Sequence, residues 1–250
     1  PHLGASTGEA QENVAIAVAR QMVSFFEEGQ ILNAVNVPAV DPDLLKRISP
    51  YLTLAEKMGS FLAQINEHGI KEIEIASSGE IADIDMFPIS TSVLRGFLAC
   101  IVGEEINFIN APFVAEERGI EVKTSVSRKA HDFTGLLSVK VVSDDGGHSL
   151  SGTIFGKKEP RLVNIDGIAI EAEPVGNMLV FTNNDRPGVI GRIGSYLASK
   201  NINIGQFRLG RTGPKKYAMS IVNIDEALSK EMLDDIKEIP DILQAWMIKI

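Results

Sequence analysis

A polar loop at residues 183–188, with the sequence Asn-Asn-Asp-Arg-Pro-Gly, holds the side chains best suited to chemistry. It follows an apolar stretch at residues 178–182 and precedes a helical pattern. Pro187 fits the first turn of a helix, and Asp185 can accept hydrogen bonds from the free N–H groups there. A helix start offers N–H donors and a positive dipole to a carboxylate, and a nearby carboxylate suits an ammonium group. The loop therefore predicts a binding site for a small amino acid.

The elements that must position this loop fill residues 176–250. Strands are predicted at residues 178–182, 202–209, 217–221 and 242–250, with a helix after the first and another after the third. The residues expected on the buried faces of the two helices are Val189, Ile190, Ile193 and Leu197, then Leu228, Met232, Leu233 and Ile236. The order βαββαβ is ferredoxin-like.

The second of these strands contains a change of parity. Ile202 and Ile204 share one face, whereas Phe207 and Leu209 share the other. Because side chains alternate along a strand, an extra residue is needed between the pairs, and the pattern predicts a β-bulge near Gly205.

Residues 36–172 predict a separate α+β domain with helices first and strands after. A helix after Asp41 is expected to be interrupted at Pro50 and to resume until Gly69. A strand at residues 70–76 and a turn at residues 77–79 follow, the turn being a candidate anion site or a plain turn. Thr91 is the expected cap of a second helix, which is expected to bury Leu94, Phe97, Leu98, Ile101 and Val102. A short helix ending at residues 117–119 leads to strands at residues 122–127, 136–142, 150–155 and 161–170, with a hairpin turn at 144–147.

One basic cluster stands out in that domain, formed by Arg128, Lys129 and His131. Charged donors at such close spacing suit the oxygens of phosphate or of a phosphorylated metabolite. The same residues also fit a solvated hairpin end, and both interpretations remain open.

The N-terminal residues predict a loop and then a helix. Ser6 or Thr7 is the expected N-cap, and the helix is expected to run to about Glu28. Its expected buried face consists of Val14, Val18, Met22 and Phe25. Prolines at 38 and 42 then predict an extended linker, so the domains are expected at residues 1–35, 36–172 and 173–250.

The composition excludes several classes of protein. A formal charge of −9 argues against nucleic acid or an anionic membrane as partner. Cys100 is the single cysteine, so neither an internal disulfide nor a cysteine-rich metal site is expected, and a cytoplasmic location is predicted. No apolar run is long enough for a membrane span.

Three segments carry a resemblance to known families. Asp185-Arg186-Pro187-Gly188 with Asn201-Ile202-Asn203-Ile204 resembles the opening of an ACT domain, an amino-acid-sensing module. Residues 1–7 resemble the catalytic-histidine loop of the D-2-hydroxyacid dehydrogenases. The intervening domain of the long D-3-phosphoglycerate dehydrogenases resembles this chain at residues 107–112 and 152–156. The linker is similar to the segment that leads into that domain. The chain is thus similar to the C-terminal portion of that last family.

The resemblance implies an NAD-dependent parent enzyme in which His2 is the general acid/base. No Gly-x-Gly-x-x-Gly follows a strand here, and the sequence begins with Pro1, so we expect a fragment that binds no cofactor and is inactive alone.

The resemblance also implies feedback inhibition by L-serine at a site between two ACT domains of a homo-oligomer, either a dimer or a tetramer. Asp185 would bind the ammonium group, and Asn183 the carboxylate or hydroxyl. Asn203 would contribute from a paired subunit, and the carboxylate site would be completed by N–H groups near Gly188, Val189 and Ile190.

Competing functions share parts of this pattern. A structural assembly module without an effector, or a sensor of another small amino acid, remains compatible with it. RNA binding shares the βαββαβ order but conflicts with the negative charge and lacks paired exposed aromatic residues. An iron–sulfur L-serine dehydratase is excluded because one cysteine cannot hold a cluster.

Overall fold

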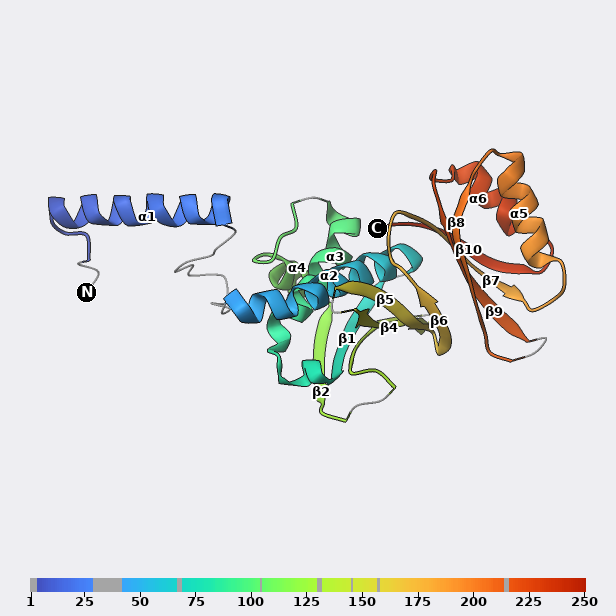
Figure 1. The fold of residues 1–250 in the computed structure, drawn as a ribbon, viewed down its shortest axis with the longest axis horizontal. Helices are drawn as coiled ribbons and strands as arrows, with labels where there is room; N and C mark the ends of the chain where they lie inside the picture. Colours follow the sequence, from blue (N-terminus) through green and yellow to red (C-terminus); the bar gives the residue numbers. More distant parts are fainter. Residues whose placement is uncertain are drawn as a thin grey trace. The chain divides into compact units, whose positions relative to one another are not determined.

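A computed structural model describes residues 4–28, 42–66, 69–103, 105–129, 132–144, 146–156, 158–213 and 216–250. The chain divides into two compact units, Pro1–Arg47 and Ile48–Ile250, and Figure 1 shows their elements. His2, His131 and the predicted linker before Pro42 lie outside the described residues. No described helix is long and apolar enough to cross a membrane.

The first unit contains helix α1, Gly8–Glu28. Thr7 caps it as predicted, because its Oγ1 accepts a hydrogen bond from the N–H of Ala10 at 3.2 Å. The predicted buried face is wrong for this structure, since the side chains of Val14, Val18, Met22 and Phe25 are 43% to 59% exposed. An apolar stripe is buried only where another element covers it, and the described part of this unit contains no other complete helix or strand.

The second unit begins with a layer of helices on a six-stranded sheet. Its elements are α2 (Pro42–Ile65, which starts in the first unit), β1 (Ile70–Gly79), the short 3-10 helix η1 (Glu80–Asp83), α3 (Met86–Val102), α4 (Ala111–Glu117), β2 (Glu121–Ser127), β3 (Gly135–Ser143), β4 (Gly146–Phe155), β5 (Glu159–Ile165) and β6 (Ile168–Ala172). The strand order is β2-β1-β3-β4-β5-β6. Strand β2 pairs with β1 in parallel because α3 and α4 carry the chain back before β2 begins, so the sheet is mixed.

Several local predictions for this region are wrong. Helix α2 continues through Pro50, because residues on either side of it, such as Ile48 and Leu54, are buried. The cap of α3 is Asp85 rather than Thr91, and its Oδ1 accepts from the N–H of Phe87 at 3.0 Å. Thr91 lies buried inside the helix instead.

Three further differences concern the ends of elements. Residues 77–79 continue β1, where Ser77 and Ser78 pair with both β2 and β3 and Gly79 pairs with β3, so they form no anion-binding turn. Ile101 and Val102 are exposed because they lie in the last turn of α3. The strand predicted at residues 161–170 is the hairpin β5–β6, because Asp166 and Gly167 both have positive φ and turn the chain.

Helices α2 and α3 cross at two glycines. A Cβ on Gly59 would overlap the carbonyl oxygen of Val93, and a Cβ on Gly96 would overlap that of Glu56. The glycines therefore allow the two backbones to touch. Arg95 of α3 also pairs with the carboxylate of Glu56 at 2.8 Å.

The rest of the second unit is a four-stranded antiparallel sheet with two helices. Its elements are β7 (Asn177–Asn184), α5 (Val189–Ser199), β8 (Ile204–Arg211), β9 (Tyr217–Ile224), α6 (Lys230–Lys237) and β10 (Ile242–Lys249). The strand order β10-β7-β9-β8 confirms the ferredoxin-like prediction. The predicted bulge is confirmed by a register shift between Ile204 and Gln206. Ile190 was expected in the core but is 49% exposed.

Both faces of the four-stranded sheet are buried. Leu179, Phe181 and Val222 pack with α5 and α6, which cover one face (Figure 1). Val180 and Ile221 face the other way and belong to the same hydrophobic core as the six-stranded sheet and α2. This double burial explains why β7 is an almost continuous apolar run rather than an alternating one.

Polar contacts reinforce this shared core. The Lys57 ammonium donates to the carbonyl oxygen of Pro174 at 2.8 Å, and burial lowers the pKa of Lys57. The side-chain amide of Gln64 bonds both the N–H and the carbonyl oxygen of Lys249. Gly210 of β8 lies directly against Ile168 of β6. The two sheets are therefore packed into one body.

Candidate functional site

The polar loop lies between β7 and α5, as predicted, but its details differ from the prediction. The N-cap of α5 is Gly188, whose φ of 94° is left-handed, and no side chain caps the helix. Pro187 therefore precedes the helix instead of forming its first turn. The first N–H groups of α5, at Val189 and Ile190, consequently have no side-chain acceptor at the cap.

Asn183 lies at the buried end of β7, with only 4% of its surface exposed. Its Nδ2 donates to the carbonyl oxygen of Asn184 at 2.8 Å, whereas its Oδ1 has no hydrogen-bond partner among the described residues. Ser220 of β9 has a buried Oγ that also lacks a partner there. Phe181 pairs with Ser220 and Asn183 with Ala218, so both side chains lie on the face covered by α5 and α6. The sequence analysis missed Ser220, because only the strand register brings it to this end of the sheet.

Asp185 does not cap α5 but pairs with Arg211, at the end of β8. The Nε of Arg211 donates to Asp185 Oδ2 at 2.9 Å, and its Nη2 contacts the same oxygen. The Asp185 side chain is 16% exposed and that of Arg211 is 49% exposed. The two residues are separated by 26 positions in the chain, and no short motif links them.

The turn before β10 holds the other side of the loop. The N–H of Asn184 donates to the carbonyl oxygen of Asp241 at 2.9 Å. The Asp241 carboxylate pairs with Arg186 at 3.4 Å and with Arg192 at 3.3 Å. These contacts tie the loop to the turn before β10.

Asn203 lies far from the other predicted contacts. It precedes β8, and its Nδ2 donates to Asp225 Oδ2 at 2.9 Å. Arg211, which pairs with Asp185, is at the opposite end of this strand. The length of β8 from Ile204 to Arg211 corresponds to roughly 23 Å. One chain therefore brings together Asn183, Asp185 and the start of α5 but not Asn203.

The predicted anion cluster forms no enclosed site in the described part of the chain. Arg128 pairs with Asp83 at 3.1 Å, and both side chains are more than two-thirds exposed. Lys129 is exposed as well, and His131 lies outside the described residues.

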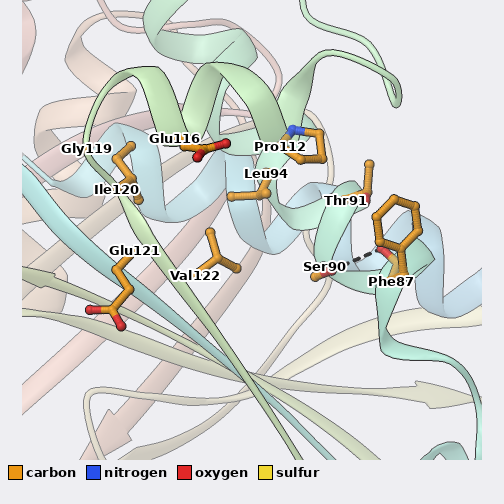
Figure 2. A pocket seen from close by; sticks show the side chains of 10 residues that line it. All are labelled: Phe87, Ser90, Thr91, Leu94, Pro112, Glu116, Gly119, Ile120, Glu121 and Val122. Carbon is orange, nitrogen blue, oxygen red and sulfur yellow. Dashed lines mark hydrogen bonds between the residues drawn. The ribbon is translucent and has the colours of Figure 1, made fainter.

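A groove of about 470 Å³ lies between α3, α4 and β2 (Figure 2). Its walls include Leu94, Ile120 and Val122, and its polar groups include the carboxylates of Glu116 and Glu121. None of the residues that line it is basic, so the groove is unsuited to phosphate.

The fold and the loop together define a class of protein, in which an α+β domain carries a ferredoxin-like ACT module with polar groups at its first helix. The family model described as D-3-phosphoglycerate dehydrogenase intervening domain matches residues 47–166, and the ACT domain model matches residues 177–241. The chain belongs to the D-3-phosphoglycerate dehydrogenase family, and it corresponds to the C-terminal part of these enzymes.

Full-chain similarity to curated relatives agrees with the family models. The chain is 34% identical to D-3-phosphoglycerate dehydrogenase of Synechocystis sp., aligning over its whole length and covering 45% of the relative. It is 32% identical to the Bacillus subtilis and Archaeoglobus fulgidus enzymes of the same name, covering 48% of each. The chain thus spans about half the length of the curated relatives it matches.

Proposed function

We propose that this chain is the effector-sensing part of an NAD-dependent D-3-phosphoglycerate dehydrogenase, and that its ACT domain binds L-serine. Asp185 binds the ammonium group, and Asn183 binds the hydroxyl or carboxylate. N–H groups near Gly188, Val189 and Ile190 receive the carboxylate. The parent enzyme oxidises 3-phosphoglycerate to 3-phosphohydroxypyruvate in the cytoplasm, with His2 as general acid/base.

The observation that carries this proposal is a pair of unsatisfied polar atoms on β7 and β9, on the face of the sheet covered by α5 and α6. Asn183 Oδ1 and Ser220 Oγ are buried without a hydrogen-bond partner in the described structure. Leaving such a group unpaired costs about 1–3 kcal/mol, so a ligand that satisfies it gains that free energy on binding. L-Serine has a hydroxyl, an ammonium and a carboxylate within a few bonds of each other, and it suits a site with an amide, a hydroxyl, a carboxylate and free N–H groups.

A paired subunit completes the proposed site. Strand β8 is the last strand of its sheet and, among the described residues, has a hydrogen-bonded neighbour strand on only one side. If two β8 edges pair antiparallel about a twofold axis, the start of one strand lies beside the end of the other. Asn203 of the partner subunit then approaches the Arg211 end of the first chain, near Asp185. This arrangement supports a homo-oligomer that pairs through its ACT domains, as a dimer or a tetramer.

Isothermal titration of the 250-residue chain with L-serine tests the proposal, with glycine, D-serine and inorganic phosphate as comparison ligands. Selective binding of L-serine supports the sensor. Preferred binding of glycine or another small amino acid would show that the effector is not L-serine. If a folded dimer binds none of these ligands, the domain is an assembly module without an effector.

The variant Asp185→Asn tests the assignment of the ammonium contact. Hydrogen bonds to charged groups contribute about 1.5–3 kcal/mol, so we expect the affinity for L-serine to fall roughly 10- to 100-fold. Asp234→Asn is the matched control, because it removes one exposed carboxylate from α6. Equal affinities of the two variants would contradict the role of Asp185.

A further inference from the structure

We propose that Arg211 is the internal counter-ion of the effector site: it occupies Asp185 when the site is empty, and the effector ammonium displaces it and releases the end of β8. The inference rests on the proposed function, because it requires an ammonium ligand at Asp185. It adds a residue that sets the affinity and a route from the site to the subunit edge.

Arg211 and an effector ammonium would compete for one carboxylate oxygen of Asp185. Both the Nε and the Nη2 of Arg211 are directed at Asp185 Oδ2, with Nε at 2.9 Å. The Arg211 side chain is about half exposed, whereas the Asp185 carboxylate is mostly covered. A cationic ligand that arrives from solvent therefore meets a carboxylate whose Oδ2 is already bound to a guanidinium. It must displace that group to form the same contact.

The Asp185–Arg211 ion pair lies at one end of the sheet and crosses β9. Ala218 of β9 pairs with both Asn183 of β7 and Arg211 of β8, so these residues form one row on the α5 and α6 face. Neighbouring strands lie about 5 Å apart, so Arg211 is about 10 Å from β7 across the row. The ion pair spans β9 and ties the effector loop to the edge strand.

The end of β8 also contacts the six-stranded sheet and the turn before β9. Gly210, next to Arg211, lies against Ile168 and the carbonyl oxygen of Ala169 in β6. After Arg211 the chain turns, and the N–H and Oγ1 of Thr212 both donate to the carbonyl oxygen of Tyr217. Loss of the Asp185 contact removes one of the links that hold this strand end. The change reaches both the open edge of the ACT sheet and the six-stranded sheet.

Calorimetry on the 250-residue chain and three variants tests the competition. Arg211→Met removes the competing cation, and we expect L-serine to bind about two- to fivefold more tightly, the gain that an exposed ion pair of this kind supports. Arg211→Lys keeps the charge with fewer donors and should lie between the wild type and Arg211→Met. Arg208→Met is the matched control: Arg208 is an exposed arginine on β8, three residues away, so its side chain points to the opposite face, and its loss should leave the affinity unchanged.

NMR of the wild-type chain provides a second readout that does not depend on how well a variant folds. The Nε–Hε signal of Arg211 should be protected from exchange with solvent in the free chain and lose that protection at saturating L-serine. Weaker or unchanged binding by Arg211→Met, or an Nε–Hε signal that stays protected, would overturn the inference while the proposed function stands. Absence of L-serine binding by the wild type would overturn both.

Discussion

The side-chain amide of Gln64 makes the two hydrogen bonds to Lys249 that a neighbouring strand would make at β10, one edge of the ACT sheet. Its Nε2 donates to the carbonyl oxygen of Lys249 at 3.0 Å, and its Oε1 accepts from the N–H of Lys249 at 2.9 Å. Strand β10 is the edge of its sheet, so these peptide groups have no strand partner on that side in the part of the chain that the structure describes. Replacing Gln64 by Met keeps the length of the side chain and removes both of these hydrogen bonds. It also removes the contacts of Nε2 with the carbonyl oxygen and the Oγ of Ser60 within α2, which leave the edge of the sheet untouched.

The expected loss of stability follows from those two bonds. A hydrogen bond between neutral groups contributes about 1 kcal/mol net, and Lys249 is exposed, so water can partly replace the lost partner. We therefore expect Gln64→Met to lower the free energy of unfolding by about 1–2 kcal/mol. For a unit of this size, that corresponds to a fall in Tm of roughly 2–8 °C.

Urea unfolding and hydrogen exchange together check this prediction. The unfolding midpoint should fall, and the amide of Lys249 should exchange faster in the variant. Gln244→Met is the matched control, because Gln244 is an exposed glutamine on the same strand. If Gln64→Met and Gln244→Met share one midpoint and one exchange rate at Lys249, the two bonds do not hold the sheet edge.

Two further predictions concern packing and pH. Gly96→Ala should lower the stability by about 1–3 kcal/mol, because its Cβ overlaps the carbonyl oxygen of Glu56. Gly194→Ala, whose Cβ meets open space in α5, should raise it by about 0.5–1 kcal/mol, and equal unfolding midpoints would refute the close crossing of α2 and α3. Burial and, second, the hydrogen bond to Asp235 raise the pKa of Tyr196 from 10.0 to about 12. The protonated Tyr196 therefore stabilises the folded state fully below pH 10, and this contribution is lost as the pH rises to about 12. Urea midpoints should therefore show a difference between the wild type and Tyr196→Phe that shrinks over this interval, whereas a constant difference would contradict the shift.

Patterns that depend on alternation alone were predictable from the sequence. The bulge in β8 followed from the parity of Ile202, Ile204, Phe207 and Leu209, and the register shift lies where that parity changes. Such predictions succeed because a strand with a buried face has no freedom to place its apolar residues on the wrong side.

Predictions that depend on one local signal were less reliable. Pro50 signals a helix break, yet burial on both sides of it keeps α2 continuous, because tertiary packing outweighs the loss of one backbone hydrogen bond. Thr91 looks like a cap, but Asp85 is followed by Pro88 in the first turn and starts the helix earlier. A cap can be assigned from sequence only when one candidate is present.

The candidate site was predictable only in its contiguous part. Asn183, Asp185 and Gly188 lie within six consecutive residues, so they stay close in space wherever β7 and α5 are placed. Ser220 and Arg211 join them through the register of β9 and β8, which the sequence does not specify over such separations. The sequence therefore predicted the carboxylate of Asp185 but not Arg211, the cation that pairs with it.

The edges of the ACT sheet decide how the proposed effector can act. One face is covered by α5 and α6, and the other is packed in the core shared with α2 and the six-stranded sheet. Of the two edges, β10 is bonded to Gln64, whereas β8 has no hydrogen-bonded strand on its outer side in the described chain. We therefore expect a second subunit to extend the sheet at β8, the strand that ends in Arg211. The proposed ammonium site and the proposed subunit contact thus share one strand end, so release of that end is the step by which occupancy of the first would change the second.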